Sequence, residues 1–170
     1  FPNLKCYAQI MKILILGIGS PFADDQAGWF VADQLSHLES LQTLISAGKL
    51  VIEAENRPGL SLLDWLHYDY EQIILVDMVK TNLAETGNIY QLKAQEIIGF
   101  SGMLSSHNLG VSPSLALAEV LGMNIQNIIF WGIEGERYKP EQEISAEMLA
   151  AVAVVVTQIE GYLGRVINAL

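Results

Sequence analysis

The sequence predicts an α/β fold, a three-layer sandwich in which helices cover both faces of a mostly parallel, twisted, five-stranded sheet. Short apolar runs alternate along the chain with segments of helical periodicity, which is the pattern of β-α-β units. The first apolar run, Ile13 to Leu16, is continuous, as expected for a strand buried on both faces. The chain is also long and apolar enough for one sizeable core, because it has 170 residues of which 51% are hydrophobic.

The amino-terminal half is expected to contain three strands with helices between them. Asp24 or Asp25 can begin the first helix, whose apolar residues recur at helical spacing to about Glu39. The third strand ends at Asp77. The expected elements are strand 13–16, helix 24–39, strand 50–54, a short helix 60–66 and strand 72–76.

The carboxyl-terminal half continues the alternation. Ser112 is a typical N-cap residue before Pro113, Gly122 ends that helix, and Ser145 caps the final one. The expected elements are strand 88–92, a Gly- and Ser-rich loop 100–109, helix 112–121, strand 127–133 and a long helix after 145. The buried stripe of the last helix is predicted to be Ile144, Met148, Val152, Val156, Ile159 and Leu163.

We expect residues 11–170 to form a single domain. Residues 1–10 precede a Met11-Lys12 pair that resembles a natural start, so we interpret them as an upstream extension outside the fold. They lack the long apolar segment and the cleavage site of a signal peptide. Cys6 is the single cysteine, which excludes an internal disulfide and a cysteine-based zinc site.

The net charge of the chain indicates which kinds of partner its surface could bind. The formal net charge is −10, which argues against a nucleic-acid or anionic-membrane surface, because such surfaces need clustered Lys and Arg. It is compatible with a cationic or metal-bearing partner. The longest apolar run, residues 148–156, is too short to span a bilayer. We therefore expect a soluble, cytoplasmic protein.

Acidic residues follow two strands that should be neighbours. With right-handed crossovers, the first strand can lie between the second and the third. The loop with Asp24 and Asp25 then faces Asp77 at the sheet edge where open α/β proteins bind ligands. Gly17 and Gly19 would let the backbone approach a ligand closely.

Each acid also has a structural interpretation. Asp24 and Asp25 can cap the helix that follows them and interact favourably with its dipole. Asp77 can act as a cap or form a salt bridge with Lys80 or Arg57, which would offset its desolvation.

One histidine belongs to a third loop. His107 lies in the Gly- and Ser-rich segment before the helix that starts at Ser112. One imidazole and two carboxylates from three loops would make a metal site with nitrogen and oxygen ligands and open positions. A loop histidine is more often structural, however. His37 and His67 lie in helical contexts and are interpreted as surface or interface residues.

A nucleotide-binding oxidoreductase is a competing hypothesis. Gly17-Ile18-Gly19 could begin a dinucleotide fingerprint, and Glu53 or Glu55 could bind a ribose. Phe22, however, stands where the third glycine is required. The sequence also contains neither a Walker loop nor a Gly-x-Ser-x-Gly elbow.

Residues 17–28 read Gly-Ile-Gly-Ser-Pro-Phe-Ala-Asp-Asp-Gln-Ala-Gly. This segment resembles the opening of the hydrogenase maturation proteases, in which Gly-x-Gly-Asn and a short apolar stretch precede Asp-Asp/Glu-Gly-x-Gly. Ser20 replaces the usual asparagine, and Gln26 replaces the usual glycine. Residues 74–77, 106–122 and 131–134 are similar to further family motifs, so the resemblance covers residues 11 to about 165.

The resemblance implies an endopeptidase that removes the C-terminal extension of a [NiFe] hydrogenase large-subunit precursor after nickel insertion. The family's metal ligands and catalytic residues fall on Asp25, Asp77 and His107, with Asp24 as an adjacent cap. The nickel would be read from the precursor, and other divalent metals could take its place. A water bound to the metal, or polarised by Asp25 or Asp77, would attack the scissile carbonyl. The alternative is a non-catalytic maturation chaperone on the same fold that binds metal or a partner.

Overall fold

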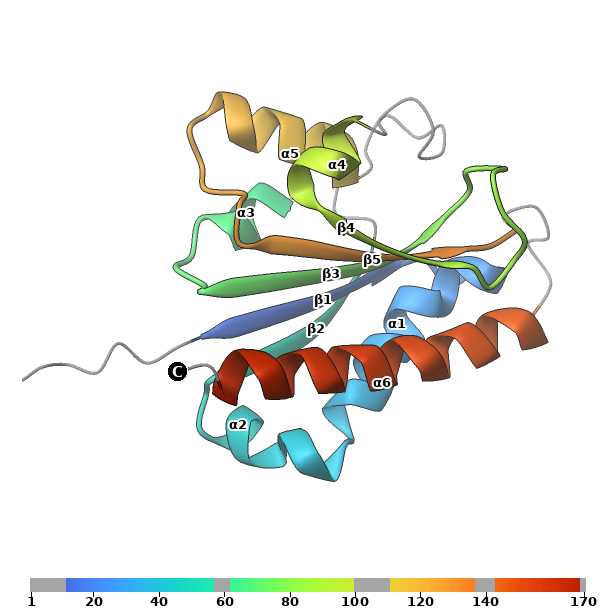
Figure 1. Ribbon diagram of the computed structural model, residues 1–170, viewed down its shortest axis with the longest axis horizontal. Helices are drawn as coiled ribbons and strands as arrows, with labels where there is room; N and C mark the ends of the chain where they lie inside the picture. The colour runs from blue at the N-terminus through green and yellow to red at the C-terminus, as the bar shows by residue number, and fades with distance from the viewer. Residues whose placement is uncertain (1–11, 57–61, 100–110, 137–142, 169–170) are drawn as a thin grey trace, which may run out of the picture.

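In the computed structural model of the chain, the first apolar run forms β1 (Ile13–Gly19), which lies between β2 (Leu50–Asn56) and β3 (Gln72–Val79). β5 (Ile128–Glu134) follows β3, and β4 (Ile89–Lys93) completes the order β2-β1-β3-β5-β4 (Figure 1). β4 is antiparallel to β5 and the other pairs are parallel, which confirms the predicted sheet. The structure describes residues 12–56, 62–99, 111–136 and 143–168.

Helices form the two outer layers. α1 (Ala27–Ser36) and α6 (Ala146–Asn168) cover one face of the sheet (Figure 1). α3 (Leu62–Leu66), α4 (Ala94–Gly99) and α5 (Val111–Val120) cover the other. The predicted three-layer sandwich is therefore confirmed, with the first strand flanked by the second and the third.

The continuous apolar run of β1 supplies both cores. Successive strand residues point to opposite faces. Ile13 and Ile15 therefore pack in the layer of α1 and α6. Leu14 and Leu16 pack in the layer of α3, α4 and α5.

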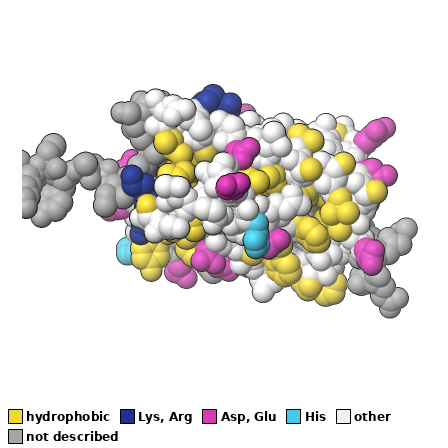
Figure 2. Space-filling view, turned by 90° about the horizontal axis from the view of Figure 1, so that it is seen from below, with side chains coloured by type: hydrophobic (Ala, Val, Ile, Leu, Met, Phe, Trp, Pro, Cys, Tyr) yellow, Lys and Arg dark blue, Asp and Glu magenta, His cyan; other side chains and the backbone are white. Residues whose placement is uncertain are grey.

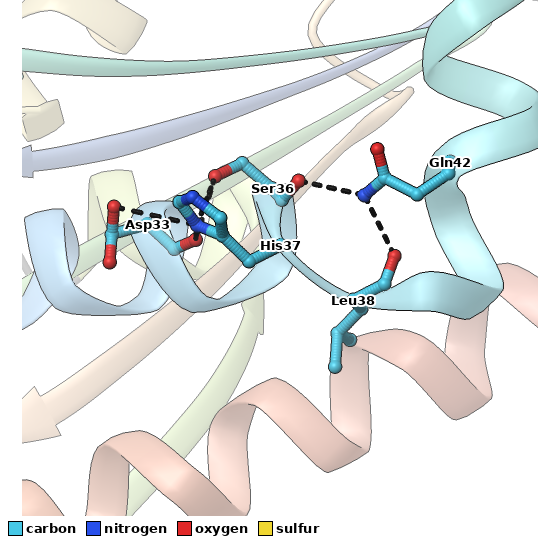
Figure 3. Close-up of polar contacts among 5 residues, drawn as sticks. All are labelled: Asp33, Ser36, His37, Leu38 and Gln42. Atoms are coloured by element: carbon cyan, nitrogen blue, oxygen red, sulfur yellow. Dashed lines mark hydrogen bonds and ion pairs between the residues drawn. The ribbon is translucent and has the colours of Figure 1, made fainter.

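The first helix differs from its prediction at both ends. A 3-10 turn, η1 (Ala23–Gln26), precedes α1, and α1 ends at Ser36 rather than near Glu39. Beyond that end, the Gln42 side chain donates hydrogen bonds of 2.9 Å each to the carbonyls of Ser36 and Leu38 (Figure 3). The first bond satisfies a carbonyl that the end of the helix leaves open, and the second adds to the Leu38 carbonyl, which also accepts the Leu41 amide at 3.1 Å.

Three short elements were not predicted: η2 (Glu39–Leu41), α2 (Gln42–Ser46) and α4. Elements of one or two turns contain too few residues to show helical periodicity. α5 begins at Val111, one residue before the predicted cap, and Gly122 follows its end with φ +76°. The predicted extension 1–10 and the loop 100–109 lie outside the described residues.

β3 is longer than predicted. Its ladder with β5 continues to Val79 opposite Glu134, because Met78 and Val79 are buried apolar residues. The prediction ended the strand at its first charged residue. Asp77 consequently lies inside β3, opposite Gly132, rather than after the strand.

The stripe predicted for α6 is buried, and Ile144 packs against the same core from just before the helix. Ser145 accepts a hydrogen bond from the Met148 amide at 3.2 Å, which confirms its role as N-cap. By length and composition alone, α6 could cross a membrane. Its stripe packs against the sheet, and acidic side chains are scattered over the face of the molecule seen in Figure 2.

Candidate functional site

The two predicted acidic segments meet at the carboxyl edge of the sheet. η1, which carries Asp24 and Asp25, follows β1 and contacts both β1 and β3. Asp77 lies near the end of β3. The parallel pairing of β1 with β3 thus brings the segments to one edge, where open α/β sheets bind ligands.

Glycines let α1 and η1 approach the strands closely. A β-carbon at Gly28 would lie 2.1 Å from the Ile18 carbonyl oxygen and 2.7 Å from that of Val76, the residue before Asp77. A β-carbon at Gly17 would lie 2.1 Å from the Gly28 carbonyl oxygen. At Gly19 it would lie 2.3 Å from the carbonyl oxygen of Asp25. Backbone-to-backbone packing therefore sets where Asp25 lies relative to β1 and β3.

Asp25 is buried and held by the turn that precedes it. Its carboxylate accepts a hydrogen bond from the hydroxyl of Ser20. Its backbone carbonyl accepts the Ser20 amide at 3.1 Å, and its amide donates to the Phe22 carbonyl at 3.0 Å. Ser20, the position at which the sequence departs from the motif that it resembles, is therefore a donor that orients the carboxylate. The sequence showed the substitution but not this contact.

Asp77 is half-buried, and its Oδ1 atom is enclosed by protein. By strand alternation it belongs to the same side of β3 as Ile73, Leu75 and Val79, which pack in the layer of α3, α4 and α5. Of its two suggested ion-pair partners, Lys80 pairs with Glu136 at 2.6 Å. Arg57 lies outside the described residues.

Asp24 does not cap the helix that follows it, contrary to the prediction. Neither η1 nor α1 has a side-chain cap, because the 3-10 turn leads straight into α1 and the Ala27 amide bonds to the Asp24 carbonyl. The buried Asp24 carboxylate instead accepts the Ser145 amide at 2.9 Å and the Glu136 amide at 3.0 Å. Asp24 therefore anchors both ends of the connection between β5 and α6.

Removing that anchor should destabilise the fold. Asp24→Ala leaves two partly buried amide donors without their acceptor, and we expect the free energy of unfolding to fall by about 2–4 kcal/mol. The matched control is Asp33→Ala on α1, whose exposed carboxylate lies 3.7 Å from His37 Nδ1 (Figure 3). That variant should stay within about 0.5 kcal/mol of the wild type. Urea unfolding measures both, and equal values for the two variants would contradict the anchoring role.

The histidines differ in position. His37 is exposed at the end of α1, where its Nδ1 lies 2.8 Å from the Asp33 carbonyl oxygen. His67 is also exposed and contacts the ring of Tyr68. Both are surface residues, as expected, whereas His107 lies outside the described residues. Within the described ranges, no three His, Cys, Asp or Glu residues form a group that could hold a metal.

Sequence analysis missed Glu134, a buried carboxylate at the end of β5. It accepts the Thr81 amide at 2.8 Å and also the Thr81 hydroxyl. The same hydroxyl lies 3.2 Å from that of Tyr90. Glu134 thus fixes the start of the connection between β3 and β4. The sequence does contain a signal for Glu134, an acidic residue directly after an apolar run, and the same pattern singled out Asp77.

Two cavities lie beside α3. The larger, of about 480 Å³, is lined by Lys12, Glu55, Asp64, Trp65, Tyr68 and Tyr70. The smaller, of about 260 Å³, includes Tyr70 and Asn127, which precede β3 and β5 and so mark the opposite edge of the sheet. Burial and the nearby Tyr68 and Glu53 raise the pKa of Tyr70 above its ordinary value. None of the carboxylates described above at the other edge lines either cavity.

A family model described as hydrogenase maturation protease (HycI) matches residues 50–162, more than half of the chain. The matched range includes the positions of Asp77 and His107 and begins after Asp25. A search of curated protein sequences found no match.

Solved structures of maturation peptidases are similar over nearly the whole chain. The hydrogenase maturating endopeptidase HybD from E. coli has a TM-score of 0.74 at 19% identity, covering 91% of this chain and 93% of that one. HybD from Thermococcus kodakarensis has a TM-score of 0.64 at 24% identity, covering 89% and 99%. The hydrogenase 2 maturation peptidase from Thaumarchaeota archaeon SCGC_AB-539-E09 has a TM-score of 0.63 at 24% identity, covering 90% and 98%. At these identities the matches show a shared fold.

Proposed function

The chain belongs to the hydrogenase maturation protease family, and from that membership we propose that it removes the C-terminal extension of a [NiFe] hydrogenase large-subunit precursor after nickel insertion. The observation that carries the proposal is the placement of Asp25 and Asp77 on adjoining elements at the carboxyl edge of the sheet. Membership makes the protein a peptidase. Its substrate, the timing of cleavage and the residues responsible are the proposal.

The proposed metal-reading centre consists of Asp25, Asp77 and His107. The close packing of Gly28 against Ile18 and Val76 supports the proximity of the two carboxylates. Carboxylate oxygen and imidazole nitrogen suit a divalent first-row transition metal. Because the Ser20 hydroxyl and the tight turn orient Asp25, its carboxylate is arranged before the precursor arrives.

The surroundings of His107 in the sequence support its membership of this centre. His107 falls between α4 and α5, which cover the side of the sheet to which Asp77 belongs. α5 leads directly into the parallel strand β5 and so runs against the strand direction. The start of α5 therefore lies toward the carboxyl edge (Figure 1).

In the proposed reaction, nickel is part of the substrate. The two carboxylates and the imidazole complete the coordination of nickel that the precursor already holds, and this docking places the scissile peptide bond beside the centre. A water polarised by nickel, or by Asp25 or Asp77, attacks the carbonyl carbon. The carbon–nitrogen bond then breaks, the released amine takes up a proton, and the cleaved extension leaves. A precursor without nickel lacks the metal ion that Asp25, Asp77 and His107 would coordinate, so it would not dock productively.

Processing of the precursor in the cytoplasm is therefore expected to depend on its nickel. The purified protein is incubated with nickel-loaded and with nickel-free large-subunit precursor from the same organism, and intact masses are measured. We expect loss of a C-terminal peptide from the nickel-loaded form only. A nickel-loaded precursor that stays intact would favour a chaperone over a peptidase. Equal cleavage of both forms would contradict the nickel dependence.

A further inference from the structure

Two large apolar side chains are exposed in the loops that leave the carboxyl edge of the sheet. Phe22 is 52% exposed and follows β1, and Leu83 is 61% exposed and follows β3. Both loops leave the same end of the sheet as the two proposed carboxylate ligands (Figure 1). Exposed apolar groups beside a functional site are typical of surfaces that bind a partner.

The backbone beside each of these side chains is in an uncommon conformation. Among the described residues other than glycine, only Ala23 and Asn82 have positive φ, at +44° and +57°. Ala23 directly follows Phe22, and Asn82 directly precedes Leu83. A left-handed conformation is unfavourable for alanine, so the surrounding structure must stabilise it, and such positions cluster at functional sites.

Buried carboxylates hold both loops. Glu134 binds the amide and the hydroxyl of Thr81, and that hydroxyl in turn accepts the Leu83 amide at 3.1 Å. Asp24, two residues after Phe22, accepts the Glu136 amide at 3.0 Å. The loop that presents Leu83 and the turn that presents Phe22 are therefore each fixed by hydrogen bonds to a buried acid.

The end of β5 joins the two loops. Glu136 bonds through its amide to Asp24 and pairs through its side chain with Lys80, at 2.6 Å, in the loop of Leu83. Glu134, two residues earlier, binds Thr81 in the same loop. Phe22 and Leu83 thus project from one connected framework rather than from independent loops, which lowers the entropy lost when a partner binds.

We propose that Phe22 and Leu83 are the apolar docking residues for the precursor, and that they receive an aliphatic or aromatic side chain of the precursor next to the scissile bond. This inference rests on the proposed function and adds its substrate-binding surface. The occupant is the precursor because the loops that carry the two side chains leave the same edge of the sheet as the proposed carboxylate centre, so a segment bound along this edge can be continuous with the bond to be cut. Apolar anchors on a rigid surface are the residues that contribute most to binding.

The test compares truncations of the two side chains with a truncation elsewhere. In processing of nickel-loaded precursor, we expect Phe22→Ala and Leu83→Ala each to raise KM about tenfold, with kcat within about twofold of the wild type. The thermal midpoint should not change, because both side chains are exposed. Phe22→Leu should restore most of the lost affinity. The matched control is Val120→Ala. Its side chain is 83% exposed, and it ends α5 on the side that leads into the start of β5, at the opposite edge of the sheet.

The outcomes separate the two proposals. If the wild type cleaves the precursor and both alanine variants keep its KM, the docking surface is wrong and the proposed function stands. If the variants change the oligomeric state in light scattering while KM is unchanged, the surface joins two copies of this chain and the inference is likewise overturned. A wild type that leaves the precursor intact overturns the proposed function and this inference together.

Discussion

Asp25→Asn should abolish processing of nickel-loaded precursor while leaving the fold intact. The amide keeps the shape of the buried side chain and can still contact Ser20, but it removes the anionic ligand and the proton acceptor. We expect kcat/KM to fall by about 10²- to 10⁴-fold, the range typical of losing a group that acts directly in the reaction. Asp77→Asn should have an effect of the same size, because both carboxylates belong to the proposed centre.

The control for these variants is Asp69→Asn, an exposed acid at the opposite edge of the sheet. It changes the net charge by the same amount and should process the precursor at the wild-type rate. Circular dichroism and thermal unfolding check that all three variants are folded. Wild-type processing by both Asp25→Asn and Asp77→Asn would remove these residues from the mechanism.

Gly28→Ala should disrupt the contact between α1 and the sheet. The new β-carbon would lie 2.1 Å from the Ile18 carbonyl oxygen and 2.7 Å from that of Val76, and neither backbone group can move without separating the helix from the strands. We expect the free energy of unfolding to fall by about 3 kcal/mol or more. The thermal midpoint should fall by about 10 °C. The rate of precursor processing should fall by more than the loss of folded protein explains. A displaced α1 also displaces η1, which carries Asp25.

Gly164→Ala provides the matched control, since a β-carbon there meets no atom within 4 Å. Alanine is the better helix former, so this variant should be as stable as the wild type or more stable by up to about 1 kcal/mol. Urea unfolding of both variants distinguishes the close approach from a general effect of replacing glycine. Similar stabilities for the two variants would show that α1 does not depend on Gly28.

Much of the framework could be predicted from local patterns. The apolar runs predicted β1 and β3, and right-handed crossovers allowed the order in which β1 lies between β2 and β3, the order that the structure has and that brings Asp25 and Asp77 to one edge. The Ser145 cap and the buried stripe of α6 also follow from local spacing. The end of β3, by contrast, was predicted wrongly from the charge of Asp77. The buried apolar residues before and after Asp77 continue the strand through it.

What the sequence could not show depends on contacts between distant residues. Asp24 resembled a helix cap, yet its partners are the amides of Glu136 and Ser145, more than a hundred positions away. The hydrogen bond from Ser20 to Asp25 requires the turn geometry, and the bond from Glu134 to Thr81 requires the completed sheet. The spacing of apolar residues does not predict these hydrogen bonds, because they depend on how the folded elements pack against one another.

The most direct test of the central claim is a crystal of this protein soaked in nickel and measured at the nickel absorption edge. If Asp25, Asp77 and His107 form the metal-reading centre, one anomalous peak should lie between β1 and β3 at the carboxyl edge. It should be about 2.0–2.2 Å from a carboxylate oxygen of each aspartate and from an imidazole nitrogen of His107. A crystal at saturating nickel with no peak there, or with nickel held by other residues, would contradict the account.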